Sequence, residues 1–454
     1  MSGSSEKPGL PMPNSFESAS VSNRSAHRVV VGTFSLKIAG AALSTALAVL
    51  MARLLGPVEY GTFSHLLALA GVAQIIISGG VPTLLLRAVA SIRDNGGASS
   101  IVGLYRRGAL LMWTGMIPGG LFAVLLLRTL DRPGISGALL ATLVGIVACS
   151  SQLSLVASAL RGMEMTLRSQ LPELILRPLA SVLLLLGYYG LGDGPIGHPA
   201  SLQLHLVAIL GALLAARLTL KSGLSLHSAS VHSQPVIQPD WGRAAMWLTL
   251  LELVNLLSAK GDLILLGFLR PPGEAGLYQV AQQCNELIGF GVSSVAIALA
   301  PVLTRLHIAG ERPQLQRLCV SVGRLSFGIS ALGATIVLIG GPELLAIVFG
   351  GDYVASFKPL SILVSGLLLS SVFGFPGLVL ISLGFDRDAA KISFFTTFAG
   401  IVASFILIRE IGLSGACYSF ASGLVIRKYL LWKTLLSRTA LNSAIYAAVR
   451  VTSR

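Results

Sequence analysis

The residues of this sequence that could do chemistry are charged and amide side chains placed inside long apolar segments. An ionisable side chain in the middle of a membrane costs at least about 2.5 to 3.5 kcal/mol, so each one requires a function or a compensating partner. Nine such side chains are candidates for the lining of a substrate cavity: Lys37, Arg177, Glu252, Asn255, Lys260, Asp262, Gln279, Gln283 and Glu286.

Two neighbouring apolar segments carry these side chains as stripes. Glu252, Asn255 and Asp262 fall within an arc of about 80°, because a helix turns about 100° per residue. Lys260 points about 160° away from Asp262, so it either approaches another helix or anchors the chain at a membrane interface. Such a stripe either lines a cavity or forms hydrogen bonds between helices. The next segment has a second polar face, formed by Gln279, Gln282, Gln283, Glu286 and Ser293.

Charged residues also occur in the first half of the chain. Lys37 lies about 12 Å into the first apolar segment, at about 1.5 Å per residue. A cation at this depth suits a phosphate or diphosphate group; alternatively, it is the counter-ion of Glu252 or Glu286. Glu173 and Arg177 are four residues apart with the acid first, so they either form a structural ion pair or leave Arg177 for the site.

Motifs for catalysis, nucleotide binding and metal binding are absent from the sequence. It contains no Gly-rich loop ending in Gly-Lys-Ser/Thr, no His-Glu-x-x-His and no nucleophile elbow. The cysteines fall in apolar segments at no metal-ligand spacing, which argues against disulfides and zinc. We therefore expect a protein that is not an enzyme and binds no cofactor or metal. The four cysteines are Cys149, Cys284, Cys319 and Cys417.

The elements that position these residues are predicted to be transmembrane helices. The composition is 54% hydrophobic and 11% charged, whereas soluble domains carry roughly a quarter charged residues. A membrane-spanning helix needs about 20 mostly apolar residues. The sequence predicts an all-α polytopic membrane protein with about twelve spans, near residues 29–51, 62–90, 104–128, 135–160, 171–190, 201–220, 244–268, 276–304, 319–341, 356–383, 390–408 and 412–436.

The distribution of Lys and Arg predicts the orientation. Basic residues gather in the connections on the side of the termini, and Arg427 is assigned to the tail on that side, whereas Arg53, Lys358 and Arg409 are among the few on the other. This places both termini in the cytoplasm and accounts for most of the +14 charge without a nucleic-acid partner. The predicted parts are a disordered tail 1–28, an N-terminal lobe 29–220, a cytoplasmic linker 221–243, a C-terminal lobe 244–437 and a cytoplasmic tail 438–454.

The two predicted lobes repeat each other. Pro57, Glu59 and Gly61 recur 215 residues later as Pro272, Glu274 and Gly276, and residues 160–164 are paired with 383–387. Internal repeats in membrane proteins usually form two lobes around a shared central site. Because each repeat holds an even number of spans, the pseudo-twofold axis is expected along the membrane normal.

Four segments carry a family resemblance. Residues 52–63, 262–267 with 276–278, 349–353 and 412–416 resemble segments of the polysaccharide transporters and O-antigen flippases. The resemblance covers nearly the whole chain after residue 28. It implies membership of the multidrug, oligosaccharidyl-lipid and polysaccharide exporter superfamily, and Asp262 is the one site candidate that matches a motif.

The resemblance implies a flippase of the bacterial inner membrane. Such a protein moves polyprenyl-diphosphate-linked oligosaccharide, the repeat unit of O-antigen or exopolysaccharide, from the cytoplasmic to the periplasmic leaflet by alternating access. We expect a central cavity lined by the first, second, seventh and eighth spans. The implied partners are the lipid-linked oligosaccharide, membrane lipids and other glycan-assembly proteins.

Three alternatives remain open. A multidrug or toxic-compound extruder and a peptidoglycan lipid-precursor flippase share the implied architecture. An envelope glycan polymerase or ligase is a third reading, from another class of protein. The outer loops argue against it, because none exceeds about 15 residues and catalytic groups would need a larger one.

Overall fold

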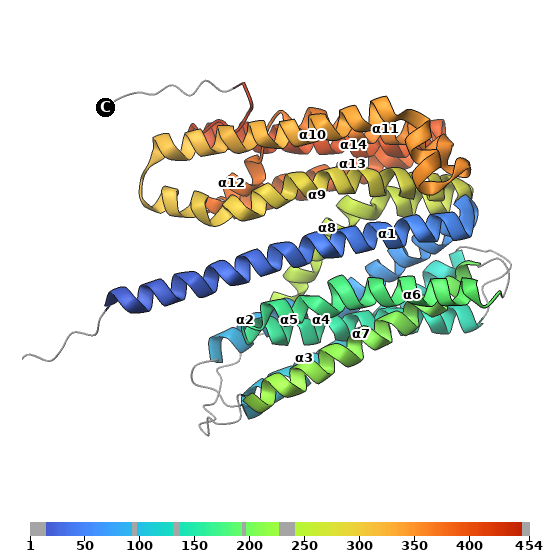
Figure 1. The fold of residues 1–454 in the computed structure, drawn as a ribbon, viewed down its shortest axis with the longest axis horizontal. Helices are drawn as coiled ribbons and strands as arrows, with labels where there is room; N and C mark the ends of the chain where they lie inside the picture. Colours follow the sequence, from blue (N-terminus) through green and yellow to red (C-terminus); the bar gives the residue numbers. More distant parts are fainter. Residues whose placement is uncertain (1–14, 93–97, 130–136, 193–196, 227–240, 447–454) are drawn as a thin grey trace, which may run out of the picture.

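The computed structural model describes residues 15–92, 98–129, 137–192, 197–226 and 241–446, and this part of the chain is all-helical (Figure 1). A short π-helix, Pro172–Leu176, precedes α6, and a 3₁₀ turn, Gly351–Ser356, precedes α11. The helices are α1 (Ser15–Ser78), α2 (Val81–Ile92), α3 (Ala98–Thr129), α4 (Gly137–Gly162), α5 (Thr166–Leu171), α6 (Arg177–Gly190), α7 (His198–Leu226), α8 (Trp241–Leu269), α9 (Pro272–Ile308), α10 (Arg312–Phe349), α11 (Phe357–Ser371), α12 (Pro376–Ser382), α13 (Asp386–Ile411) and α14 (Leu413–Thr439).

Seven segments of the described chain are long and apolar enough to cross a membrane. One of them, Gly32–Ser78, covers most of the predicted span 29–51 and the first part of the predicted span 62–90, which is interrupted at Gly79 and Gly80, where α1 ends. Between these two parts α1 bends at Gly56, whose φ is 71° and ψ is 172°. Glycine tolerates this left-handed φ, and Pro57 can start the second half of α1 since it has no N–H to donate. The predicted all-α polytopic fold is confirmed. The seven segments are Gly32–Ser78, Gly137–Gly162, Thr166–Gly190, His198–Ser225, Arg312–Phe349, Gly351–Ser371 and Asp386–Ile411.

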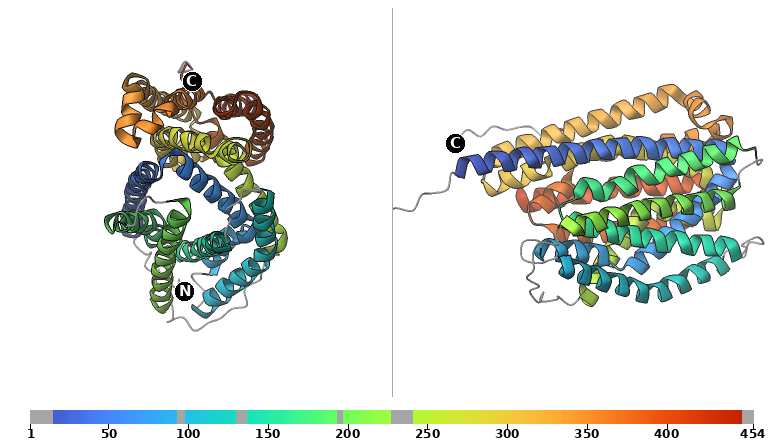
Figure 2. Two further views of the ribbon diagram at one scale, coloured as in Figure 1. Left: turned by 90° about the vertical axis from the view of Figure 1, so that its right-hand side faces the viewer. Right: turned by 60° about the horizontal axis from the view of Figure 1, so that its bottom comes forward.

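The helices form two bundles. Figure 1 shows α9 to α14 gathered above α1, and α2 to α7 below it; α8 crosses between them. The view along the molecule in Figure 2 shows the same two groups separately. The largest cluster of buried apolar side chains extends across both bundles, from Met51 and Phe63 of α1 to Leu266 of α8 and Leu363 of α11.

The predicted repeat is visible as two equivalent helix caps. One Glu59 carboxylate oxygen accepts the backbone N–H of His198, the first residue of α7, at 2.7 Å. One Glu274 carboxylate oxygen accepts the N–H of Leu413, the first residue of α14, at 3.0 Å. In both lobes the glutamate and the residue whose N–H it caps are 139 residues apart. A carboxylate satisfies an unpaired N–H and favours the positive end of the helix dipole, so the repeated Glu starts the last helix of each lobe.

A second repeated turn corrects the predicted pairing of 160–164 with 383–387. The N–H of Met165 donates to Leu160 at 2.9 Å, and that of Phe385 donates to Leu380 at the same distance. Each turn has one residue with positive φ, 60° at Glu164 and 84° at Gly384. These are two Schellman turns with an offset of 220 residues. The predicted pairing is therefore shifted by three residues from the pairing that these turns define.

The two lobes meet at the end of the molecule that carries Gly56, His198, Pro272 and Leu413, which we call the bend end. A Cβ built on Gly61 would overlap the Pro272 carbonyl oxygen, and one on Gly276 would overlap the Pro57 carbonyl oxygen. Because each glycine meets the other lobe's copy of the same proline, the pseudo-twofold axis passes between them.

Helices extend into the predicted N-terminal tail and into the predicted linker. α1 begins at Ser15, inside the predicted disordered tail 1–28, because residues 15–28 contain neither Pro nor Gly and an existing helix propagates easily. α7 ends at Leu226 and α8 begins at Trp241, so both enter the predicted linker 221–243. Residues 1–14 and 227–240, and residues 447–454 of the predicted tail 438–454, lie outside the described part.

The tenth predicted span, 356–383, is interrupted. α11 ends at Ser371 and α12 starts at Pro376, and Gly374 between them has a φ of 68°. The chain after α14 folds back onto this break: Ile445 N–H donates to Val372 at 3.1 Å, and Ser443 Oγ donates to the Phe373 carbonyl at 2.8 Å. Irregular backbone at membrane depth is tolerated where protein satisfies it, and here the segment after α14 does so.

Candidate functional site

A cavity of about 310 Å³ lies between the lobes. Both halves of α1, with His205 of α7, form one wall, and α8 and α9 form the other, so the sixth predicted span joins the first, second, seventh and eighth in the lining. Its polar lining consists of a lysine, a histidine, a tyrosine, a glutamine and two serines. These residues are Ser44, Tyr60, Ser64, His205, Lys260 and Gln279.

Lys260 of the cavity wall is paired with an acid. Its Nζ lies 3.0 Å from Oε1 of Glu286 on α9. Gln282, one turn before Glu286, donates from Nε2 to the same oxygen at 3.5 Å. Of the two alternatives for Lys260, the structure shows approach to a neighbouring helix and not an interfacial anchor. The counter-ion of Glu286 is thus Lys260, not Lys37.

Arg177 does not line the cavity, but it lies on α6, which contacts the cavity wall through Ser181. Glu173 and Arg177, which are both described, form no ion pair within 4.0 Å, so the structural pair predicted as one alternative is not formed. His205 of α7 lines the cavity. Ser181 Oγ is 3.5 Å from His205 Nδ1. The rings of Phe63 and His205 pack edge-to-face, with their centroids 6.1 Å apart. Arg177 follows directly after the π-helix, an irregularity that is frequent at functional sites.

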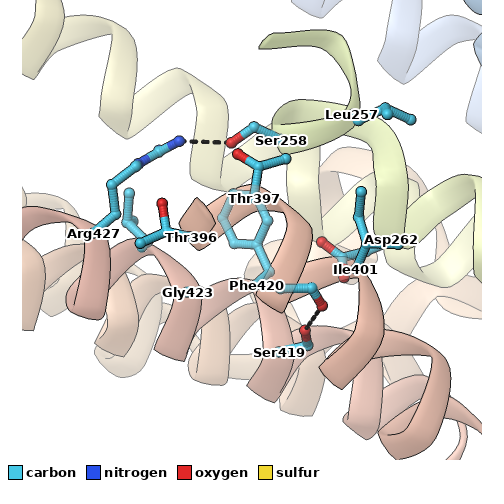
Figure 3. Close-up of a pocket in the computed structure, with 12 residues that line it drawn as sticks. Leu257, Ser258, Asp262, Thr396, Thr397, Ile401, Ser419, Phe420, Gly423 and Arg427 are labelled. Atoms are coloured by element: carbon cyan, nitrogen blue, oxygen red, sulfur yellow. Dashed lines mark hydrogen bonds between the residues drawn. The ribbon is translucent and has the colours of Figure 1, made fainter. Parts of the chain in front are cut away.

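Asp262 lies in a different pocket, inside the C-terminal lobe. This small cavity, about 50 Å³, is enclosed by α8, α13 and α14 (Figure 3). Arg427 Nη1 donates to Ser258 Oγ at 2.6 Å at one end, and Ser419 Oγ donates to the Gly400 carbonyl at 3.0 Å at the other. Thr397 Oγ1 is buried without a hydrogen-bond partner among the described residues. The pocket combines one carboxylate, one guanidinium and several hydroxyls.

The other candidates belong to neither cavity. Glu252 accepts a hydrogen bond from Thr83 Oγ1 of α2 at 3.4 Å, so it joins α8 to the other lobe. Asn255 is exposed, and Gln283 is half-buried on α9. Lys37 is half-buried and has no carboxylate partner in the described ranges. The predicted stripe of Glu252, Asn255 and Asp262 therefore does not line one cavity.

Sequence reasoning missed several lining residues. His205 is an ionisable side chain in an apolar span and could have been recognised on that ground. Tyr60 stands in the repeated Pro-x-Glu-x-Gly segment, which predicted the repeat but not a cavity. Arg427 was assigned to the cytoplasmic tail, whereas it lies within α14 and lines the Asp262 pocket. The hydroxyls of Thr397 and Ser419 gave no signal, because Ser and Thr are common in membrane helices.

Comparison with solved structures defines the class of fold. The chain is similar to a multidrug resistance MATE family transporter of the MOP superfamily in its inward-facing conformation: the TM-score is 0.71 at 14% identity, over 91% of this chain and 98% of that one. The outward-facing conformation gives a TM-score of 0.58 at 14% identity, over 91% and 96%. The lipid II flippase MurJ, inward closed, gives 0.60 at 13% identity, over 89% and 86%. The fold is therefore the twelve-helix, two-repeat fold of these proteins.

The particular family follows from the sequence model for polysaccharide biosynthesis proteins, which matches residues 29–307. This match covers more than half of the chain. The protein thus belongs to the polysaccharide biosynthesis protein family. No curated protein sequence matches the chain significantly.

Proposed function

We propose that this protein is a flippase that moves polyprenyl-diphosphate-linked oligosaccharide across the bacterial inner membrane by alternating access between its lobes. The observation that carries the proposal is the cavity between the lobes, whose largely apolar lining includes six polar side chains, one of them the cation Lys260. A substrate with a diphosphate and a sugar needs both features. Membership of the polysaccharide biosynthesis family and a fold shared with a lipid II flippase support the same function.

Two cations are free to attract the diphosphate. Lys260 is already neutralised by Glu286, whereas Arg177 and Lys37 have no carboxylate partner in the described part of the chain. An unpaired cation near a polar cavity favours a charge-assisted hydrogen bond to phosphate oxygens. Arg177 is the stronger candidate, because it lies one turn before Ser181, whose Oγ is 3.5 Å from His205 Nδ1 in the cavity wall.

The sugar would be recognised by amide oxygens of α9. Gln279 Oε1 is a buried acceptor without a partner among the described residues, and the same holds for Gln282 Oε1 and Asn285 Oδ1 on this helix. Leaving a buried acceptor unpaired costs about 1 to 3 kcal/mol. Hydroxyl groups of a sugar are donors, and at the cavity wall they would satisfy Gln279.

The Asp262 pocket would bind a coupling cation or a proton, and the substrate would bind elsewhere. Its volume of about 50 Å³ is too small for a sugar. The chain carries no nucleotide-binding motif, so an ion gradient is the energy source that we propose. Both termini would lie in the cytoplasm and the bend end in the periplasm. Other glycan-assembly proteins are the proposed partners.

The proposal is tested by the leaflet distribution of lipid-linked oligosaccharide in cells depleted of this protein, measured with a reagent that reaches only the outer leaflet. We expect accumulation in the inner leaflet, rescue by the wild type and by Arg409→Gln, and about tenfold weaker rescue by Arg177→Gln. Full rescue by an Arg177→Gln/Lys37→Gln variant would refute the anion site.

The fold shared with a multidrug transporter makes extrusion of drugs the second candidate. A cationic drug would have to displace Lys260 from Glu286, whose side chain is 41% exposed. Unchanged glycan export together with increased sensitivity of depleted cells to cationic drugs would contradict the flippase proposal and support drug extrusion.

A further inference from the structure

A groove of about 590 Å³ runs between α11 and α14, and it belongs to neither cavity described above. Figures 1 and 2 show both helices in the half of the molecule remote from α2 to α7. Three large side chains at the groove are about half exposed, at 57% for Leu369, 48% for Tyr418 and 52% for Ile426. A membrane-spanning bundle turns such side chains to lipid, so the groove opens to the bilayer.

The floor of the groove is formed by small residues. A Cβ built on Gly366 would lie 2.5 Å from Cβ of Ala421, so the two helices touch at this point. The larger side chains of both helices stand to either side of this contact. The groove is therefore part of the packing of α11 on α14 and persists as long as these helices remain together.

The hydroxyls in the groove are already satisfied by their own helices. Ser361 Oγ donates to Phe357 at 2.9 Å, Ser365 Oγ to Ser361 at 2.7 Å and Ser422 Oγ to Ser419 at 3.1 Å. No hydroxyl among these three requires a polar ligand. Apart from Lys358 and Tyr418, the remaining lining is apolar, with Ile362, Leu369, Val425 and Ile426 as its large side chains, so it suits a hydrocarbon chain.

A single cation stands at one end of this lining. Lys358 is exposed, lies at the start of α11 and forms no ion pair within the described residues. The distance along the helix from Lys358 to Leu369 is about 16 Å. This is close to half of the hydrocarbon thickness of about 30 Å, which is one leaflet. The groove thus combines a positive charge at the membrane surface with an apolar channel one leaflet deep.

We propose that this groove binds an anionic phospholipid, whose phosphate pairs with Lys358 and whose acyl chain lies between α11 and α14. With the bend end in the periplasm, the lipid belongs to the outer leaflet. The site is separate from the cavity between the lobes, so it does not depend on the identity of the transported substrate. A basic residue near the surface contributes to attraction of anionic headgroups, which gives the preference over a zwitterionic lipid.

The test is native mass spectrometry of the full chain released from nanodiscs that contain equal amounts of phosphatidylglycerol and phosphatidylcholine. We expect one retained phosphatidylglycerol per chain for the wild type and about fivefold less for Lys358→Gln. Ser365→Leu, which fills the groove, should lower retention of both lipids. Arg409→Gln, a change of an exposed cation at the same end on α13, should behave like the wild type.

Three results would overturn the proposal. The first is equal retention of phosphatidylglycerol by Lys358→Gln and the wild type. The second is a chain dimer whose contact protects a cysteine at Ser365 from labelling, which would make the occupant a second copy. The third is retention of a polyprenyl phosphate from the source membrane in place of phospholipid. Each is read from mass or labelling alone, so failure of the flippase assay would leave this test unaffected.

Discussion

At the scale of single residues, Glu59 and Glu274 make the repeat testable. Each caps the last helix of its lobe, but only Glu59 also contacts a histidine, with His198 Nδ1 2.6 Å from Oε2. Burial acts to raise the pKa of Glu59, and the hydrogen bonds and charge of His198 act to lower it; the net pKa is below the ordinary value of 4.5. The ionised form is therefore the one that stabilises the fold.

We predict that Glu59→Gln lowers the free energy of unfolding by about 1 kcal/mol or less at neutral pH, since the carboxylate is partly exposed. The depressed pKa sets the sign: the contribution is complete above pH 4.5 and is lost as the pH falls through the folded-state pKa. Thermal melting in detergent from pH 7 to pH 3.5 measures it. The difference between wild type and variant should shrink toward the acid end, and a constant difference would contradict this role.

The matched variant is Glu274→Gln, which changes the equivalent cap at Leu413; here the second partner of the carboxylate is Arg270, with Nε 3.3 Å from Oε2, in place of a histidine. Its effect at neutral pH should be similar, because the cap is the same. If Glu59→Gln and Glu274→Gln differ by several-fold, the two carboxylates do not have equivalent roles and the repeat is only a likeness of sequence.

The site residues could be predicted from the sequence only in part. Helical periodicity correctly placed Lys260 and Asp262 on opposite sides of one helix. It could not say which cavity each side of the helix faces, because that depends on the packing of α8 against α9, α13 and α14. Lys260 therefore lies in the cavity between the lobes and Asp262 inside one lobe. His205 is not predicted, because the candidate side chains comprise only Lys, Arg, Asp, Glu and amides.

At the scale of elements, hydropathy predicted the spans but not their irregularities. The tenth span is an uninterrupted apolar run in the sequence, yet the helix breaks between Ser371 and Pro376. Proline alone did not predict the break, because membrane helices tolerate it when neighbours satisfy the backbone. The neighbour here is the segment after α14, which is distant in sequence and polar, and so was assigned to a tail.

Asn442 holds that segment in place. Its side-chain oxygen accepts hydrogen bonds from Trp432 Nε1 at 2.9 Å and from Ala444 N–H at 3.0 Å. Gln316 of α10 exchanges two further hydrogen bonds with its backbone, at 2.8 and 2.9 Å. Ala444, on the same segment, is fully buried. The segment is therefore part of the C-terminal lobe.

We predict that Asn442→Ala destabilises the protein by about 2 kcal/mol, because it leaves two donors unpaired. Asn442→Asp keeps the acceptor oxygen and should remain close to the wild type. Thermal melting and limited proteolysis of the C-terminal end measure both effects. Equal stability of Asn442→Ala and the wild type would show that the segment is dispensable.

At the scale of the whole molecule, the lobes are held together at the bend end by backbone contacts that only glycine allows. We predict that Gly61→Ala and Gly276→Ala separate the lobes there, because the new methyl group would overlap a carbonyl oxygen that cannot move independently. Gly273→Ala is the control, since its Cβ would meet only Val58 Cγ2 at an ordinary 3.6 Å.

The measurement for these three variants is the labelling of a cysteine at Ser44, inside the cavity, by an impermeant reagent added from the periplasmic side. This cysteine is introduced into a protein from which the four native cysteines have been removed. Labelling should increase for Gly61→Ala and Gly276→Ala and not for Gly273→Ala. Equal labelling of all three would mean that this contact does not control access.

Arg53 and Tyr353 complete the closure of the bend end from opposite lobes. Arg53 Nε donates to the Val348 carbonyl at 2.8 Å and its Nη2 to Ile347, at the carboxyl end of α10, where carbonyls lack helical partners. Tyr353 donates from its hydroxyl to the Ala52 carbonyl at 3.1 Å.

Since Arg53 is exposed, we expect Arg53→Gln to weaken closure by about 1 kcal/mol, or about fivefold in the open fraction. The Ser44 cysteine should then label faster from outside, and Tyr353→Phe should add to the effect. Arg409→Gln, which removes another exposed cation at this end, should leave the rate unchanged. Faster labelling from the cytoplasmic side instead would mean that the bend end faces inward, and both the proposed orientation and the direction of transport would have to be reversed.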